Sequence, residues 1–372
     1  MLIKFSCEKS LLVSAISVAS RTVSPKSPLT VLEGIFLQAG EKLHLTGYNL
    51  ETGITVEVPA EIEKQGECIL PARLIFDIVR RLPDELVSVE VDDDYKISIE
   101  CGISKYRISA ENAADYPELP EVGEGDAVEL PQRELRDLIN GTLFSVSDNA
   151  SRPILTGVLF EIAEDSVTAV AIDGFRLALR RFRPETPFLK TMTVVVPAPA
   201  LREVEKLLGD TDEPARISLE RRHILFTVGD ATLVCRLLEG DFMDWRKVLQ
   251  TEPTIRLVAD VEQLAMAFER VSLVVSEKFK GPAHCLFSKN AVTLKTATVV
   301  GTAQDSCPLA GDGGDLEIGF NCRYVLDALR QVPDQEVTLE LTNELNPIVL
   351  KPTTEKDTFT YLILPMRIKK EG

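Results

Sequence analysis

The chain has 372 residues, of which 45% are hydrophobic, so it is long enough for two or three ordinary domains and is not a disordered protein. Its net charge of −17 argues against a protein held on nucleic acid by many phosphate contacts, because such proteins usually present a basic face. Seven scattered cysteines without a CxxC pair predict reduced thiols in a cytoplasmic protein instead of a disulfide framework.

The N-terminal segment contains a fairly apolar stretch, Leu11–Ala19, which could be read as a secretory signal. Two charged residues, Glu8 and Lys9, precede it, and serines interrupt it. Its hydrophobic residues recur at helical spacing, so an amphipathic helix over Glu8–Arg21 is the better interpretation. No apolar run approaches the ~20 residues needed to cross a membrane, so we expect no membrane association.

Three segments of the chain share one order of elements: a short apolar strand, a helix, a turn and several short strands. The junctions between strand and helix lie at Pro71, Pro197 and Asn321, which are 126 and 124 residues apart. This spacing predicts three copies of one α+β domain, each with two helices and two antiparallel sheets. We place the copies at residues 1–125, 126–250 and 251–372. The alternative is three unrelated domains of similar size.

Each copy is expected to contain two helices. The predicted ranges are Glu8–Arg21, Pro71–Leu82, Pro131–Ser145, Pro197–Leu208, Asp260–Ser276 and Asn321–Val332. Pro71 and Pro197 suit the first helical position, where no backbone N–H is needed. After the second helix, runs such as Val87–Val91, Tyr95–Glu100 and Tyr106–Ser109 alternate with period two and predict hairpins.

Over its whole length the chain resembles the β subunit of bacterial DNA polymerase III, the sliding clamp family. Five motifs in the order and spacing of that family carry the resemblance: Pro71-Ala72-Arg73, Asp173-Gly174-Phe175-Arg176-Leu177-Ala178, Glu277-Lys278-Phe279-Lys280-Gly281, Gly319-Phe320-Asn321 with Tyr324-Val325-Leu326-Asp327, and Leu364-Pro365-Met366-Arg367. The resemblance implies a head-to-tail homodimeric ring that is lined by helices and walled by sheets. It also implies a non-enzymatic processivity factor without cofactor or metal. Such a ring encircles double-stranded DNA without reading its sequence. It tethers the polymerase III α subunit, the clamp loader, and other polymerases or repair proteins through short peptides.

The charge distribution fits a ring of this kind. The six predicted helices sum to +2, so the remainder of the chain carries −19. A nearly neutral lining would allow sliding, and an acidic outer wall would discourage DNA from binding the wrong face. The alternative is that the charge simply keeps a protein soluble.

Five side chains are expected on the DNA-facing side. Lys26, Arg73, Arg80 and Arg152 are the basic residues expected to touch phosphate, with Asn149 nearby. Lys26 lies in a proline-rich loop where the resemblance places a DNA contact. Arg73 and Arg80 are seven residues apart and therefore share one helix face. Ordinary solvated side chains are the alternative for each of them.

The resemblance also implies a hydrophobic groove between the middle and last domains, where partner peptides dock. The matching residues are Leu155, Ile172, Gly174, Phe175, Arg176, Leu177, Met243, Val248, Leu362, Ile363, Leu364, Pro365, Met366 and Arg367. Apolar walls would supply most of the affinity, and Gly174 would let a peptide approach the backbone. The alternative is that Leu155, Leu177 and Ile363 are core residues. An exposed apolar chain end is unusual, so we favour the groove.

Two features depart from the family pattern. Ile172 and Phe175 stand where the family often has a small polar residue and a histidine, so the groove should be more apolar. The chain also continues beyond Arg367 as a charged extension, Ile368–Gly372, to which we assign no role.

The resemblance places the ring seam between Tyr106 and Ile108 of one chain and Leu273 and Val274 of the other. Pairing of an edge strand across the twofold axis would close the sheet. The expected facing segment, Thr298–Gln304, contains no charged residue. We therefore expect a seam that is held by apolar contact and depends little on salt.

Two other classes of function are alternatives to a sliding clamp. An enzyme is disfavoured because His44, His223 and His284 are far apart in sequence, no nucleotide, protease or hydrolase motif occurs, and Asp173 has no evident catalytic partner. A paralogous clamp-like ring, acting as a scaffold or spare copy, remains the alternative to the main replication clamp.

Overall fold

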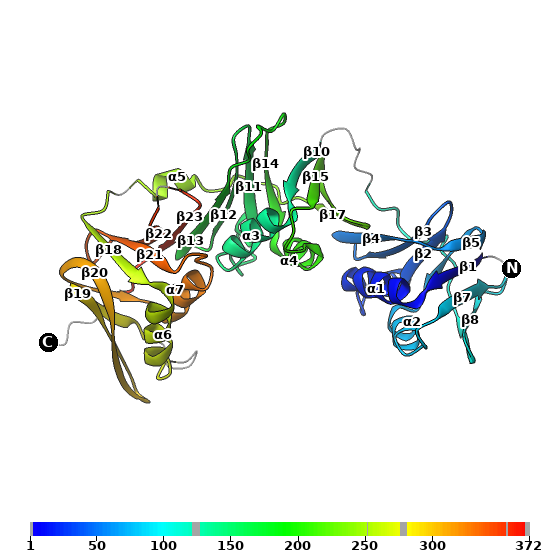
Figure 1. The fold of residues 1–372 in the computed structure, drawn as a ribbon, viewed down its shortest axis with the longest axis horizontal. Helices are drawn as coiled ribbons and strands as arrows, with labels where there is room; N and C mark the ends of the chain where they lie inside the picture. Colours follow the sequence, from blue (N-terminus) through cyan, green and yellow to red (C-terminus); the bar gives the residue numbers. More distant parts are fainter. Residues whose placement is uncertain (1–2, 121–126, 251, 276–280, 355, 369–372) are drawn as a thin grey trace. The chain divides into compact units, whose positions relative to one another are not determined.

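The computed structural model describes residues 3–120, 127–250, 252–275, 281–354 and 356–368 (Figure 1). The described residues form seven α-helices: α1 (Lys9–Ala19), α2 (Ala72–Val79), α3 (Gln132–Leu143), α4 (Ala198–Leu207), α5 (Trp245–Val248), α6 (Val261–Ser272) and α7 (Cys322–Leu329). Six of them are the predicted helices, each beginning one residue after its predicted start. The seventh, α5, is a single turn that is too short for helical periodicity to reveal. The motif Glu277–Lys280 lies outside the described residues.

The prolines at the strand-to-helix junctions directly precede the first helical residue, whereas they were predicted to be that residue. Pro71 has φ −66° and ψ 98°, and its carbonyl accepts the first helical hydrogen bond from Ile75 N at 2.9 Å. Pro71 is therefore the N-cap of α2, not its first helical residue, and Pro197 ends the strand before α4. The prediction was wrong because proline fixes φ but leaves ψ free to remain extended.

The strands form three sheets, in which all recorded strand pairs are antiparallel. The first contains, in spatial order, β5 (Glu61–Lys64), β1 (Ile3–Glu8), β7 (Leu86–Val91), β8 (Lys96–Cys101) and β9 (Ser104–Ser109). The second contains β10 (Ala127–Pro131), β15 (Pro214–Glu220), β16 (His223–Val228), β17 (Ala231–Arg236), β4 (Thr52–Val58), β3 (Leu43–Tyr48), β2 (Ile35–Ala39) and β6 (Gly66–Leu70). The third contains β14 (Met192–Pro197), β11 (Gly157–Ala163), β12 (Ser166–Ile172), β13 (Arg176–Phe182), β23 (Phe359–Ile363), β22 (Ile348–Pro352), β21 (Glu336–Leu341), β18 (Ile255–Asp260), β20 (Gly301–Phe320) and β19 (Ala283–Thr298). The hairpins predicted in the first repeat are β7, β8 and β9, and this prediction is confirmed.

Two of these sheets continue from one repeat into the next. Strand β17 of the middle repeat pairs with β4 of the first, from Ala231↔Val56 to Cys235↔Thr52. Strand β13 of the middle repeat pairs with β23 of the last, from Arg176↔Ile363 to Arg180↔Phe359. The chain accordingly divides into two compact units, residues 1–133 with 199–237 and residues 134–198 with 238–372. Each unit contains one of these joints, and the middle repeat contributes to both units.

In the last repeat, one long hairpin of β19 and β20 packs beside α6 (Figure 1). Strand β20 pairs with β19 along most of its length and meets β18 at Val258↔Ala310. Just beyond that point Gly311 and Gly314 have φ values of 122° and 62°, which bend the strand where L side chains would be strained. The hairpin therefore forms one edge of the ten-stranded sheet.

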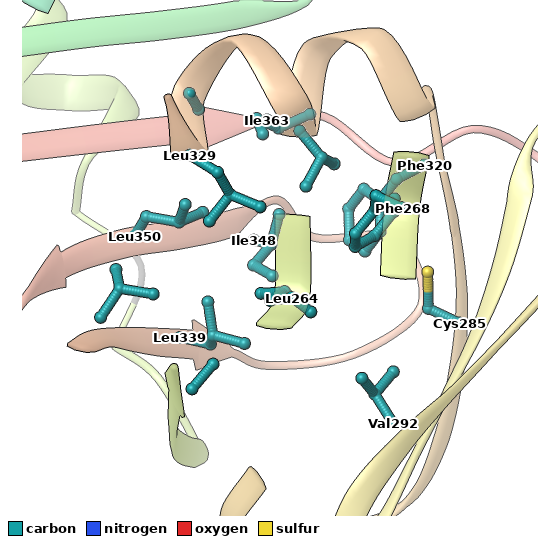
Figure 2. Packing of buried hydrophobic residues seen from close by; sticks show 14 of the residues in the cluster. Leu264, Phe268, Cys285, Val292, Phe320, Leu329, Leu339, Ile348, Leu350 and Ile363 are labelled. Atoms are coloured by element: carbon teal, nitrogen blue, oxygen red, sulfur yellow. The ribbon is translucent and has the colours of Figure 1, made fainter. Parts of the chain in front are cut away.

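The core of the last repeat lies between its two helices and its strands (Figure 2). Leu264 and Phe268 of α6 point into it, and Leu329 enters from α7. A side-chain oxygen caps the N-terminus of each helix: Asp260 Oδ1 accepts from Gln263 N at 2.8 Å, and Asn321 Oδ1 accepts from Arg323 N at 3.0 Å. Local capping and apolar spacing thus agree with the packing.

The N-terminal helix α1 is an amphipathic core helix, as predicted. Its buried residues are Leu12, Ala15, Ile16 and Ala19. A Cβ at Gly47 of β3 would lie 1.9 Å from the Ala19 carbonyl oxygen, so glycine allows the helix end to approach the sheet.

None of the helices in the described part of the chain is long and apolar enough to cross a membrane.

All seven cysteines are buried thiols, and none forms a disulfide. Burial raises the pKa of Cys68 and of Cys235 to about 12, and that of Cys322 to about 11. Because the thiolate is the reactive form, we expect almost no alkylation by iodoacetamide at pH 8 in the folded protein. Mass spectrometry should find seven modified thiols after denaturation, and fast labelling of the folded chain would contradict this prediction.

Candidate peptide-binding and DNA-facing sites

The joint between the middle and last repeats divides the expected groove residues between two faces of one sheet. Leu177 of β13 pairs with Leu362 of β23, and the two pack with Ile172 in a small apolar cluster. Val248 at the end of α5 packs against the same cluster. Ile363, the next residue of β23, lies on the other face in the core of the last repeat. The core interpretation therefore fits Ile363.

The turn before β13 is formed by Asp173 and Gly174. Asp173 Oδ1 accepts hydrogen bonds from Phe175 N at 2.8 Å and Arg176 N at 3.0 Å. Gly174 has φ +94° and no atom within 4 Å of a Cβ position, so the turn needs glycine and leaves open space above the backbone. Asp173 is thus a turn-forming residue, which accounts for it without catalysis.

Arg176 is held beneath this turn by two carboxylates and two aromatic rings. Its Nε donates to Asp173 Oδ2 at 2.9 Å, and its Nη1 donates to Asp327 Oδ2 of α7 at 2.7 Å. The guanidinium lies 4.4 Å from the Tyr324 ring centroid and 5.6 Å from that of Phe144. With only 10% of its side chain exposed, Arg176 connects the two repeats structurally.

The C-terminal tail is fixed beside the turn by backbone hydrogen bonds. Leu364 N donates to Phe175 O at 2.8 Å, and Met366 N donates to Gly319 O at 2.7 Å. A Cβ at Gly319 would lie 2.7 Å from the Met366 carbonyl oxygen, so glycine is needed for the tail to dock. Leu364 and Met366 are thereby held at the surface, 38% and 37% exposed.

These contacts place exposed apolar side chains around the Gly174 turn. Phe175 is 60% exposed and stacks on Tyr324 with a ring-centroid distance of 6.3 Å. We call Phe175, Leu364 and Met366 the apolar ledge. Met243 is also exposed, at 41%. Exposed apolar side chains are typical of a docking surface when hydrogen bonds hold their backbone in place.

Two residues that the sequence analysis did not single out, Ile154 and Trp245, also contact the apolar cluster. Leu155 is buried and its carbonyl accepts from Ser147 N, whereas its neighbour Ile154 packs against the apolar cluster. Trp245 of α5 belongs to the cluster but was not predicted. Its only sequence signal was that it is the single tryptophan of the chain.

The expected DNA-facing side chains are all exposed, but one of them, Arg80, shares an acidic partner with its neighbour Arg81. Asp77 of α2 lies 2.5 Å from Arg80, and Arg81 donates to Asp77 at 3.1 Å. The hydrogen bond from Arg81, with the nearby Arg80 and Arg73 charges, holds the pKa of Asp77 below its ordinary value. This helix face is therefore less basic than its arginines alone suggest.

The remaining three expected DNA contacts lie in exposed loops. Lys26 is in the loop before the short 3₁₀ helix Thr30–Glu33. Asn149 and Arg152 are in one turn, where Arg152 N donates to Asn149 O at 3.1 Å. These positions allow phosphate contact without a preformed binding pocket.

The expected seam residues lie on sheet edges and on an exposed tip. Tyr106 and Ile108 are on β9, the outer strand of its sheet. The carbonyl of Val274 accepts a 2.7 Å hydrogen bond from Thr298 Oγ1, which joins the end of α6 to the tip of the β19–β20 hairpin. Leu273 is 83% exposed there. The two charged side chains of β9, Lys105 and Arg107, pair with Glu100 and Asp92 of the same chain.

Within the residues that the structure describes, no group of three or more His, Cys, Asp or Glu side chains could hold a metal ion. His44 lies 4.0 Å from Glu57, and His284 lies 3.6 Å from Glu317. Both pairs are at the surface, and Glu57 also pairs with Lys42 at 2.7 Å, so these are ordinary surface ion pairs.

Three domain families match the chain in order. The N-terminal domain of the DNA polymerase III beta subunit matches residues 3–120, the central domain residues 129–244, and the C-terminal domain residues 246–367. This chain belongs to the DNA polymerase III beta subunit family. The predicted threefold α+β architecture is confirmed as that of the beta subunit.

Known beta subunits match along the entire chain. A beta sliding clamp of Staphylococcus epidermidis is 30% identical over 377 residues, covering 98% of this chain and 100% of the relative. The sliding clamp structure of Bacillus subtilis is 27% identical with a TM-score of 0.94, covering 99% of this chain and 100% of its own. A Pseudomonas aeruginosa sliding clamp structure bound to griselimycin is 28% identical with a TM-score of 0.92, over 99% of this chain and 100% of its own. The sliding clamp interpretation is confirmed, and these matches do not favour a paralogous scaffold ring.

Proposed function

We propose that two copies of this chain close head to tail into a ring around double-stranded DNA. The observation that carries the proposal is the succession of three beta-subunit domains over nearly the whole chain. The ring would act as a processivity factor without catalysis, cofactor or metal, in the cytoplasm. We keep the domain boundaries at 125/126 and 250/251; the first lies at residues outside the described part of the chain.

The partner site of this ring is the surface around the Gly174 turn. Its base would be the buried cluster of Ile172, Leu177 and Leu362, and its exposed part would be the apolar ledge with Met243. An apolar peptide segment could pack on the ledge while the open backbone at Gly174 allows close approach. The polymerase III α subunit, the clamp loader and other polymerases or repair proteins would bind here in turn.

Contacts with DNA would be weak and would not depend on sequence. Arg80 pairs with Asp77, which Arg81 also contacts, so part of the positive charge on this helix is already balanced. Lys26, Asn149 and Arg152 would supply contacts from exposed loops. Enclosure, not affinity, would keep the ring on DNA, because strong phosphate pairing would oppose sliding.

The seam is expected to be insensitive to salt. The hairpin tip exposes Val299 and Val300, at 84% and 63%, and the charges of β9 are already paired within their own chain. The dissociation constant of the dimer should change by less than about threefold between about 50 and 500 mM NaCl. Analytical ultracentrifugation would measure it, and a dimer that dissociates readily with added salt would contradict an apolar seam.

The test of the ring uses topology. The chain is loaded onto nicked circular DNA by its own clamp loader, and the circle is then cut once. Retention on the circle with release from the linear product is the expected result. Equal retention on both forms would show direct DNA affinity and would overturn the ring mechanism.

A further inference from the structure

A cavity with a volume of about 220 Å³ lies at the end of the β13–β23 joint that is farther from the Gly174 turn. Strand β13 begins at Arg176, next to that turn, and Arg180 and Phe182 at its other end line the cavity. Four residues of extended strand span about 13 Å, so the cavity is separate from the apolar ledge. Its remaining walls come from the start of α3, from the segment after α7 and from the segment before β23.

One wall of the cavity holds a buried arginine whose hydrogen-bonding groups are unused. The side chain of Arg180 is 9% exposed, and it passes close to α3, where a Cβ at Gly141 would lie 2.8 Å from Arg180 Cδ. Its ion-pair partner among the described residues is Asp137, at 3.9 Å, which is too far for a hydrogen bond. The guanidinium also lies 5.7 Å from the Phe359 ring centroid. None of its nitrogens is among the fully buried, unpaired polar atoms of the described chain, so they are accessible from the cavity.

Arg176 shows how the same strand satisfies an arginine of equal burial. The two side chains lie on one face of the sheet, because residues four apart in a strand point the same way. Arg176 is 10% exposed and donates to two carboxylates, at 2.9 and 2.7 Å. Arg180, in contrast, donates a hydrogen bond to none of the described residues. A buried guanidinium without acceptors is costly, so an anionic oxygen that enters the cavity would meet unused N–H groups.

The other charged side chains of the cavity determine which anion fits. Lys356 is exposed at the rim and forms no ion pair with another described residue, so it adds a second available cation. Asp137 and Asp334 also line the cavity and are exposed. These carboxylates would repel a doubly charged phosphate more than a single carboxylate, and they would attract a basic group beside it. The charges therefore suit a ligand that carries one carboxylate next to one cation.

We propose that this cavity is a second docking site for partner proteins, which takes an Asp or Glu side chain that has a Lys or Arg beside it. The Arg180 guanidinium donates to both oxygens of the carboxylate, as arginine does in bidentate pairs. Lys356 pairs with the same carboxylate from the rim, and the basic side chain of the partner lies against Asp334. The volume admits side chains but not a folded domain. This site does not depend on the proposed peptide site, because it lies at the other end of the joint.

The test uses the full chain labelled with ¹⁵N-arginine and observes the Nε–H signal of Arg180 by NMR. The Arg180→Lys variant, which lacks this group, assigns the signal. The probe is N-acetyl-glutamyl-lysine amide, which has one carboxylate and one ammonium group. We expect a saturable shift with a Kd on the order of 1 mM, and at least about tenfold weaker binding of N-acetyl-glutaminyl-lysine amide, which lacks the charged acceptor. Inorganic phosphate and free lysine should both bind more weakly than the glutamyl probe.

Two exposed cations provide matched variants that leave the core of the protein intact. Lys356→Met should weaken the glutamyl probe about threefold, because it removes the rim cation, whereas Arg323→Met, outside the cavity, should not change its affinity. Absence of a saturable shift, or equal weakening in the two variants, would overturn the site. Equal binding of the glutaminyl probe or tighter binding of phosphate would overturn the carboxylate assignment. Tighter binding of free lysine would identify a small-molecule site and overturn docking by a partner protein.

Discussion

Replacing Arg176 by methionine is expected to lower the free energy of unfolding by about 3–5 kcal/mol, because it leaves Asp173 and Asp327 as partly buried carboxylates without their common partner. Methionine retains much of the apolar stem, so the loss reports the charge and its hydrogen bonds. The loss should appear in the unfolding transition of the unit that contains residues 134–198 and 238–372. Denaturant unfolding followed by circular dichroism would measure it.

Arg323→Met is the matched control. Arg323 also approaches Asp327, at 3.9 Å, but 76% of its side chain is exposed. Exposed pairs of this kind contribute about 0–1 kcal/mol, so this variant should remain close to the unmodified protein. If the two variants lost equal free energies of unfolding, the burial of Arg176 would not be the reason that its contacts are strong.

Gly319→Ala is expected to weaken partner-peptide binding by at least about tenfold, because the apolar ledge depends on the docked tail. The added methyl group would lie 2.7 Å from the Met366 carbonyl oxygen and 2.9 Å from Ile368 Cγ1. Relief of this overlap would require the tail to move, with loss of the hydrogen bond from Met366 N to Gly319 O. Fluorescence anisotropy with a labelled clamp-binding peptide would measure the affinity.

Gly40→Ala provides the control for adding one methyl group. A Cβ at Gly40 meets only the Lys42 carbonyl oxygen, at 3.9 Å, which is an ordinary contact. Peptide affinity should be unchanged in that variant. If Gly319→Ala bound peptide normally while remaining folded, the tail would not be part of the binding surface.

The sequence predicted the local elements well because local signals determine them. The starts of the six longer helices were misplaced by only one residue, since apolar spacing and the prolines at two of the junctions mark them. The alternating strands of the first repeat were found for the same reason. The one-turn helix α5 has neither signal, and its Trp245 was missed with it.

Contacts between distant segments could not be predicted from local pattern. Arg176 and Asp327 are 151 residues apart, and nothing in either neighbourhood indicates their pairing. The same holds for the joints of β17 with β4 and of β13 with β23, which depend on which sheet edges meet. Asp77, by contrast, could have been recognised as the partner of Arg80 and Arg81, because i, i+3 and i, i+4 spacing was visible in the sequence.

The two joints also determine which parts of this chain resist an applied mechanical force. Force applied across β13–β23 or across β17–β4 loads several backbone hydrogen bonds in parallel, and these must shear together. The outer strands β9 and β19 have no such ladder on their free sides within the described chain. Both joints should therefore act as stiff couplings. A protein that opens such a ring would meet the least resistance at the interface between the two chains.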